Sequence, residues 1–176
     1  MDDILDCFMI NPEKEYHIRE LARLTKKSPT TISKYLKMQE KTGILKSHRK
    51  FGHLLFKANT ESSSFRDLKR FYNIKKLRDS GLIDFLVRHF NNPEAIVLFG
   101  SYCKGEDIPE SDIDMLIITQ LKKEVSLERF EKILNRRIHL LLHSNNDIKT
   151  MKVKNKELLN NMLNGVVLYG FWELLK

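Results

Sequence analysis

The chain has 176 residues, of which 41% are hydrophobic and 31% charged, and its formal net charge is +8 at pH 7. This length allows one sizeable core or two small ones. The positive charge is concentrated between residues 14 and 57, where there are twelve Lys and Arg but only three acidic residues. Such an excess indicates a polyanionic partner, and nucleic acid is the first candidate. No apolar run approaches the roughly 20 residues that a membrane-spanning helix needs, which argues against a membrane protein.

The cysteines and the first residues indicate a cytoplasmic protein. Cys7 and Cys103 lie far apart and match no metal or redox spacing, so two reduced thiols are expected. The first residues, Met1 to Ile4, are acidic and lack the cationic region of a secretory signal. We therefore expect a soluble, cytoplasmic protein with no membrane partner.

Three short helices and a hairpin are predicted in residues 1–58. An apolar stripe predicts a helix over residues 2–10, and a second stripe predicts one over residues 17–25. Ser28-Pro29 provides an N-cap and a proline at the first position of a third helix, which Gly43 ends. Two alternating runs follow, residues 44–48 and 53–58, and the basic turn Arg49-Lys50-Phe51-Gly52 between them predicts a β-hairpin.

This order of elements resembles the winged helix-turn-helix of many bacterial and archaeal transcription regulators. The resemblance implies that the third helix fits the major groove of double-stranded DNA and that the hairpin reaches the neighbouring backbone. The candidate DNA-binding residues are Thr30, Thr31, Lys34 and Lys37 on the helix and Arg49 and Lys50 on the hairpin. A solvated helix face or a protein-protein contact is the alternative. Winged helices of this kind often act as dimers, which leaves a homodimer open.

The rest of the chain alternates helices and strands. Polar residues 59–64 predict a linker, and a helical region with a break near Ser80-Gly81 is expected from residue 65 towards residue 90. The continuous apolar run over residues 95–99 predicts a strand buried on both faces. Further elements are expected in the order strand, helix, strand, helix, strand, at residues 112–119, 127–134, 137–143, 154–163 and 165–169.

The most specific motif joins residues 99–105 (FGSYCKG) to residues 111–116 (SDIDML). A Gly-Ser pair, a ten-residue gap and an Asp-x-Asp pair closely resemble the signature of the DNA polymerase beta-like nucleotidyltransferases, in particular their minimal prokaryotic members. The similarity extends over about residues 75 to 176. It implies an α/β (α+β) domain with a small mixed sheet, an NTP substrate with ATP as the expected donor, and Mg²⁺ or Mn²⁺ as cofactor.

The residue types agree with that chemistry. Side chains alternate along a strand, so Asp112 and Asp114 should project from one face with about 6 to 7 Å between their Cα atoms. Mg²⁺ commonly takes two carboxylates together with substrate phosphates, which makes both residues the candidate catalytic and metal-binding pair. Gly100 would let the backbone approach the triphosphate, while Ser101 and Lys104 would offer a hydroxyl and a positive charge to the phosphates. An Asp-x-Asp pair alone would be a common solvated strand end.

His139 departs from the family pattern. The resemblance implies a third carboxylate on the adjacent strand, and the matching segment, residues 137–141 (RIHLL), has a histidine there. A histidine is not a hard oxygen ligand, although it can bind a softer metal or act as a base near neutral pH. The second metal and the activation of the acceptor are therefore in question.

These expectations define three regions and two functions. Residues 1–60 are expected to form a winged helix-turn-helix, residues 61–92 a linker with connecting helices, and residues 93–176 a nucleotidyltransferase-like domain. The first function is a DNA-associated nucleotidyltransferase that transfers a nucleoside monophosphate to an acceptor. Small prokaryotic relatives resemble the antitoxin half of toxin-antitoxin pairs, where they transfer AMP to a partner protein, and other relatives modify aminoglycosides or RNA ends. The attached winged helix and a catalytic domain of only about 100 residues favour a protein acceptor. The alternative is a winged-helix transcription regulator whose second domain is an impaired nucleotide sensor or dimerisation platform.

Overall fold

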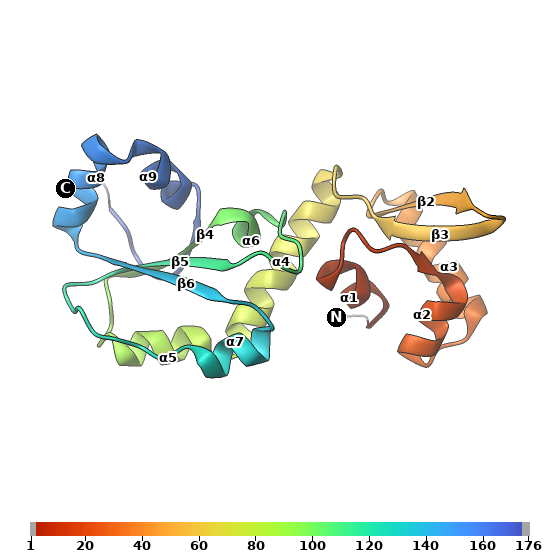
Figure 1. Ribbon diagram of the computed structural model, residues 1–176, viewed down its shortest axis with the longest axis horizontal. Coiled ribbons are helices and arrows are strands. Elements are labelled where there is room, and N and C mark those ends of the chain that lie inside the picture. The colour runs from red at the N-terminus through yellow and green to blue at the C-terminus, as the bar shows by residue number, and fades with distance from the viewer. Residues whose placement is uncertain (1–2, 174–176) are drawn as a thin grey trace. The chain divides into compact units, whose positions relative to one another are not determined.

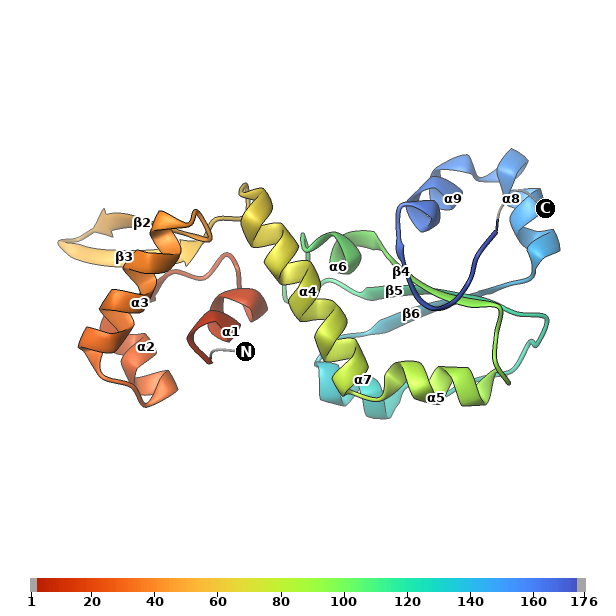
Figure 2. The same ribbon diagram turned by 180° about the vertical axis from the view of Figure 1, so that it is seen from behind.

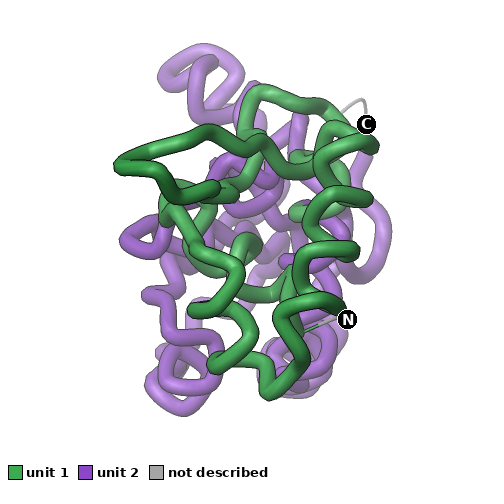
Figure 3. The backbone as a smooth tube through the Cα atoms, turned by 90° about the vertical axis from the view of Figure 1, so that its right-hand side faces the viewer, with its two compact units in different colours: residues 1–69 green, residues 70–176 purple. Residues whose placement is uncertain are grey.

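The computed structural model describes residues 3–173 and divides into two compact units, residues 1–69 and residues 70–176 (Figure 3). The helix α4 (Ser63–Asp79) begins in the first unit and ends in the second. None of the helices in the described part of the chain combines the length and the apolar character needed to cross a bilayer.

The first unit contains helices and a small antiparallel sheet. Besides the start of α4, its elements are α1 (Asp3–Ile10), β1 (Tyr16–His17), α2 (Ile18–Thr25), α3 (Pro29–Lys41), β2 (Leu45–Lys50) and β3 (His53–Ala58). The strand order is β1-β3-β2, and β3 pairs antiparallel with both neighbours. The predicted helices and hairpin are therefore confirmed over the described residues 3–58, with β1 as an additional short strand. Asp2, the first residue of the expected helix over residues 2–10, lies outside the described residues.

Local signals in the sequence explain where α2 and α3 begin and end. The imidazole of His17 accepts a hydrogen bond from the backbone of Arg19, and α2 ends at Lys26 in the left-handed conformation. The predicted N-cap of α3 is confirmed, because Ser28 Oγ accepts from Thr31 N at 3.1 Å and Pro29 follows at the first helical position. α3 therefore starts at a defined residue, which determines which of its side chains face solvent.

The core of the first unit collects apolar side chains from every helix and from the hairpin. Its largest fully buried members are Ile4, Phe8, Met9, Leu21, Ile32, Leu36, Leu45, Phe56 and Phe65. Lys69 is also fully buried and donates a hydrogen bond from Nζ to the carbonyl of Met9 at 2.9 Å. This bond ties α4 to the end of α1 within the first unit.

The second unit is a mixed sheet with helices on both faces. After α4, its elements are α5 (Leu82–His89), β4 (Ala95–Phe99), α6 (Gly100–Lys104), β5 (Ile113–Ile118), α7 (Glu128–Leu134), β6 (Ile138–His143), α8 (Asn145–Lys154), α9 (Lys156–Leu163) and β7 (Val166–Gly170). The strand order is β6-β5-β4-β7. β5 and β6 are parallel, whereas β4 is antiparallel to β5 and to β7, so the expected small mixed sheet is confirmed.

Alternation along the strands separates two cores. Ile113, Met115 and Ile117 of β5 pack with α5, α7 and the end of α4. Leu116 and Ile118 pack on the opposite face with residues of α8 and α9. Figures 1 and 2 show these two helix layers on either side of the sheet. All five residues of β4 are buried, as the continuous apolar run predicts.

Several details differ from the sequence prediction. Arg49 and Lys50, expected in the turn of the hairpin, belong to β2, and the last two residues of the expected linker 59–64 belong to α4. A single helix was expected over residues 154–163, but the chain forms α8 and α9 from Asn145 onward. The missed signal is a capping box, in which Ser144 and Asp147 bond reciprocally to each other's backbone amides. The strand expected from Asp112 begins instead at Ile113, because the neighbouring strand β6 begins at Ile138, whose partner is Ile113.

Candidate active site

Asp114 lies near the start of β5, on the face of the sheet that α8 and α9 cover further along. It shares this face with Leu116 and Ile118, because alternate residues of a strand project to the same side. The side chain of Asp114 is 28% exposed. Asp112 is exposed and belongs to the loop that leads into β5. The two carboxylates therefore stand at the same end of one strand, with one in the sheet and one just before it.

Gly100 makes room for the carboxylate of Asp114. Its φ is +76°, and a Cβ atom at this position would stand 2.4 Å from Oδ2 of Asp114 and 3.2 Å from its Cγ. Both the backbone conformation and the contact therefore require glycine. We expected Gly100 to admit a triphosphate, whereas the contact that the structure defines is with the carboxylate.

Ser101 and Lys104 belong to α6, the short helix that follows β4 directly. Ser101 is partly exposed and Lys104 is exposed, whereas Tyr102 and Cys103 between them are buried. Both cysteines are free, and burial raises the pKa of the Cys103 thiol. The helix thus anchors its apolar residues in the core and leaves the hydroxyl and the ammonium accessible.

His139 lies beside Asp114 on the parallel neighbour β6. The two residues are register partners, and Nδ1 of His139 is 3.1 Å from Oδ1 of Asp114. The His139 side chain is 59% exposed. The structure therefore places this imidazole against the metal-binding candidate, at the position where the family resemblance implies a third carboxylate.

The donor set fits a divalent cation that shares its ligands with a substrate. Among residues 3–173, no three His, Cys, Asp or Glu side chains are grouped so that they could hold a metal ion alone. Mg²⁺ keeps several waters and often takes one or two carboxylates plus substrate phosphates. Asp112 and Asp114 offer such a pair, and the lack of a Cβ at Gly100 leaves room for the Asp114 carboxylate at the end of the sheet. A metal held here would need oxygen ligands from the nucleotide.

A buried polar network holds the loop that carries Asp112. The carboxylate of Asp107 is 1% exposed and pairs with Nη2 of Arg136 at 3.0 Å. Asn73 Nδ2 donates to the other Asp107 oxygen at 2.7 Å and to the carbonyl of Tyr102 at 2.8 Å. Nη1 of Arg136 donates to the carbonyls of Ile108 and Ser111, and the latter bond measures 3.2 Å. The Arg136 guanidinium thus binds the segment that ends at Asp112 at three residues, through one carboxylate and two backbone carbonyls.

The network also determines the surroundings of Tyr102. Its ring lies 5.9 Å from the Arg136 guanidinium carbon. Burial raises the pKa of the Tyr102 hydroxyl well above its usual value, and Asp107 adds to this effect while Arg136 opposes it. The sequence analysis missed Asn73, Asp107 and Arg136 because these residues are far apart in the chain and carry no motif. The available signal was an acid shortly before the Asp-x-Asp pair and an arginine shortly before the strand β6.

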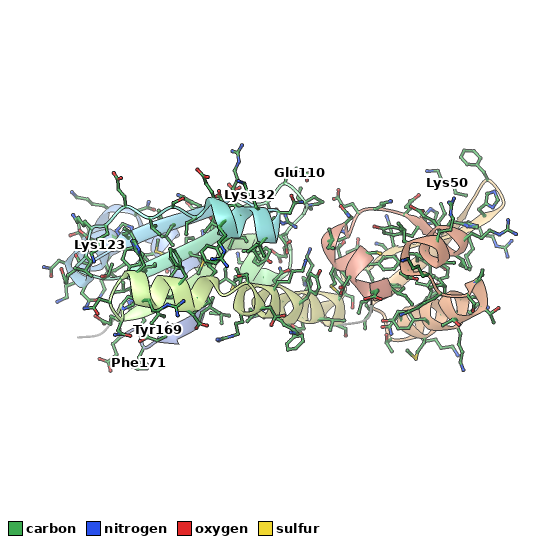
Figure 4. The ribbon with its side chains drawn as sticks, turned by 90° about the horizontal axis from the view of Figure 1, so that it is seen from below. Lys50, Glu110, Lys123, Lys132, Tyr169 and Phe171 are labelled. Atoms are coloured by element: carbon green, nitrogen blue, oxygen red, sulfur yellow. The ribbon has the colours of Figure 1, made fainter. Side chains whose placement is uncertain are left out.

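The candidate DNA-binding residues all lie at the surface of the first unit. Those on α3 and those at the end of β2 are exposed without exception: Thr30, Thr31, Lys34, Lys37, Arg49 and Lys50. Thr30, Lys34 and Lys37 line a shallow hollow together with Ile18, Pro29 and Ser33. Figure 4 shows Lys50 on the hairpin.

The sheet, the Gly-Ser turn and the carboxylate pair define the second unit as a nucleotide-transferring type of domain. Residues 81–171 match the family described as "Polymerase beta, Nucleotidyltransferase". The match covers just over half of the chain, which therefore belongs to the polymerase beta nucleotidyltransferase family, as the motif predicts. Comparisons with curated proteins and with solved structures gave no significant match.

Arg136→Ala should lower the free energy of unfolding by about 3–5 kcal/mol, because it removes the Arg136 guanidinium that pairs with the buried Asp107 carboxylate. Denaturant unfolding of the full chain measures the change. The matched control is Lys75→Ala, which removes the exposed Lys75–Asp79 pair and should cost less than about 1 kcal/mol. Equal losses for the two variants would contradict the structural role of the network.

Gly100→Ala should weaken Mg²⁺-dependent nucleotide binding by at least about tenfold, because the new methyl group displaces the Asp114 carboxylate. Isothermal titration calorimetry with ATP checks this. Gly81→Ala is the matched control, since Gly81 has a φ of +75° but open space where a Cβ would stand. In both variants alanine must adopt a positive φ, so both should lose a similar amount of stability, but only Gly100→Ala should lose nucleotide affinity. An unchanged nucleotide affinity in Gly100→Ala would contradict the proposed displacement of the Asp114 carboxylate.

Proposed function

We propose that this protein is a DNA-associated nucleotidyltransferase that transfers a nucleoside monophosphate from an NTP, with ATP as the preferred donor, to a protein acceptor. The observation that carries this proposal is the position of Asp114 beside Gly100, with Asp112 two positions earlier in the chain, in a domain of the polymerase beta nucleotidyltransferase family. The family implies an NTP substrate and a divalent metal. A domain that served only as a scaffold would have no need for these two carboxylates at a strand end.

The residues of the site have distinct tasks in this reaction. The oxygen of an acceptor hydroxyl forms a bond to the α-phosphorus and the hydroxyl proton passes to solvent, while the bond from that phosphorus to the bridging oxygen breaks and pyrophosphate leaves. Asp112 and Asp114 would hold Mg²⁺ or Mn²⁺, which supplies positive charge to the phosphate oxygens when it is bound. Ser101 and Lys104 are accessible on the adjoining helix and would bind the phosphates.

A hollow next to Asp112 supports a polar acceptor. It measures about 680 Å³, and its lining includes Asp112, Glu110, Lys132 and Arg137. Acidic and basic side chains thus occur together beside Asp112, whereas Asp114 is not part of this lining. A lining of both signs suits a polar protein segment better than an apolar small molecule, and this is our reason for favouring a protein acceptor such as a toxin partner.

One observation favours a second function, a transcription regulator with an impaired nucleotide-sensing or dimerisation domain. The imidazole of His139 occupies the place beside Asp114 where the family pattern has a third carboxylate. A neutral imidazole contributes no negative charge to a Mg²⁺ site and prefers softer metals. Nucleotide binding without efficient transfer is the behaviour that this alternative predicts.

The first unit supports DNA binding through a winged-helix arrangement. The exposed face of α3 combines Thr30 and Thr31 with Lys34 and Lys37, side chains that suit base edges and phosphates respectively. The hairpin brings Arg49 and Lys50 to its exposed end. Lys50 is 3.7 Å from Glu15, but this pair is solvent-exposed and competes only weakly with a phosphate.

We expect transfer of labelled AMP from ATP to the native partner, or to the chain itself, to require Mg²⁺ or Mn²⁺ and to be lost in Asp112→Asn/Asp114→Asn. His139→Asp should raise the Mg²⁺-dependent rate at least about tenfold, because a carboxylate favours Mg²⁺ where imidazole does not. Transfer is followed on gels.

The control for this comparison is His139→Asn, which removes the imidazole without adding charge and should not accelerate transfer. Calorimetry separates the two proposed functions. Nucleotide binding that needs both carboxylates, with no transfer even in His139→Asp, would favour the regulator. If the chain binds no NTP with any of the metals tested, the proposed nucleotidyltransferase activity is wrong.

We expect the affinity of the full chain for duplex DNA to fall steeply with salt, because lysine and arginine side chains replace counterions at the phosphates. Lys34→Ala/Lys37→Ala should reduce the slope of log K against log salt by about 1.8, since each phosphate contact contributes about 0.9. The matched control is Lys122→Ala/Lys123→Ala, an equal loss of exposed charge in the second unit (Figure 4 labels Lys123). Fluorescence anisotropy over a salt series gives both slopes, and a flat salt dependence of the native chain would reject DNA binding.

A further inference from the structure

Phe51 is the most exposed large apolar side chain among the described residues. It is 91% exposed, although aromatic side chains usually contribute to cores. It lies at the tip of the β2–β3 hairpin, between the register partners Lys50 and His53. An aromatic ring in this position contributes nothing to the core of its own unit.

The backbone at the tip makes the presence of phenylalanine more unusual. Phe51 has a φ of +49° and Gly52 a φ of +77°, so both central residues of the two-residue turn have positive φ. Such turns strongly favour Asn-Gly or Asp-Gly, and positive φ in a bulky residue is a genuine outlier. Asparagine would form this turn more easily, so the turn itself gives no reason for an aromatic residue. Strain of this kind often accompanies a functional position.

The charges around the ring indicate its partner. Arg49 and Lys50 precede it on β2 and are both exposed, as is His53 on β3. Lys50 also lies beside the tip in Figure 4. The first unit has the strongest basic excess of the chain, between residues 14 and 57. An apolar ring flanked by cations is complementary to stacked bases flanked by phosphates, whereas an apolar protein surface would gain nothing from these cations.

We propose that the Phe51 ring inserts as a wedge between adjacent base pairs of a DNA duplex from the minor groove, while Arg49 and Lys50 bind the flanking phosphates. This inference rests on the proposed DNA binding of the first unit and adds a deformation of the duplex to it. Apolar side chains that enter the minor groove partly unstack a base step and bend the helix. Pyrimidine-purine steps unstack most easily, so the wedge should prefer TA steps.

The test uses the full chain and duplexes of about three helical turns that carry 2-aminopurine at a central TA step. Fluorescence of 2-aminopurine increases when the base loses its stacking. The native protein should raise this fluorescence at saturation, and Phe51→Trp should do the same. Phe51→Asn should bind with about tenfold lower affinity, an effect of the size expected for one lost aromatic-base stack, and should leave the fluorescence unchanged.

Phe51→Asn is also the folding control. Asparagine suits the positive φ at this position, so its thermal unfolding midpoint should equal or exceed that of the native chain. The salt dependence of its DNA affinity should be unchanged, because Arg49 and Lys50 are retained. A loss of affinity without a loss of stability or of salt slope therefore isolates the ring.

The possible outcomes separate the wedge from the DNA-binding proposal. Salt-dependent duplex binding with equal affinity and equal fluorescence for the native chain and Phe51→Asn would overturn the wedge and leave DNA binding intact. No duplex binding at any salt concentration would overturn both. Affinity that depends on Phe51 only for single-stranded nucleic acid, without unstacking of the duplex, would also overturn the wedge.

Discussion

The antiparallel pairing of β4 with β5 is the interaction on which the candidate site depends. It places the end of β4 opposite Asp114, so that the chain turns into α6 at Gly100 directly against the carboxylate. A buried apolar strand thereby brings a turn and an acid together although they are 14 positions apart. The parallel pairing of β5 with β6 adds His139 to the same point. The chemistry of the site therefore follows from the register of three strands, and a slip by one residue would send Asp114 to the opposite face.

The loop before β5 is held by different forces. Residues 106–112 have no strand partner, and Asp112 is exposed. Their position depends on Arg136, which binds a carboxylate and two carbonyls through its forked donors. Lysine presents a compact charge and does not reproduce this fork. A buried ion pair is weak support for overall stability, because desolvation offsets much of its attraction, but it defines a geometry well. One carboxylate of the candidate pair is thus positioned by the sheet and the other by a buried arginine.

The first unit combines a well-packed apolar core with an exposed hairpin turn at Phe51, whose backbone has a positive φ. Its helices and hairpin share one apolar core, and local caps determine where α2 and α3 begin. The polar and cationic side chains that remain outside have no role in that core. Fold stability and surface chemistry are therefore carried by different residues, so the surface can be altered without loss of the fold. This separation makes Phe51 informative, because its ring is exposed and its backbone conformation disfavours it.

Much of the fold followed from local patterns in the sequence. Apolar periodicity, the Ser28-Pro29 cap and the run at residues 95–99 predicted most helices and strands, and the Gly-Ser and Asp-x-Asp spacing identified the family. Each of these signals involves only a few neighbouring residues, and backbone sterics and side-chain alternation are enough to determine the local structure there. Local patterns did not predict three features: the pairing of Asp107 with Arg136, the contact of Gly100 with Asp114 and the start of β5 at Ile113. Each of these depends on which distant segment lies alongside, and only the packed sheet and its buried charges decide that.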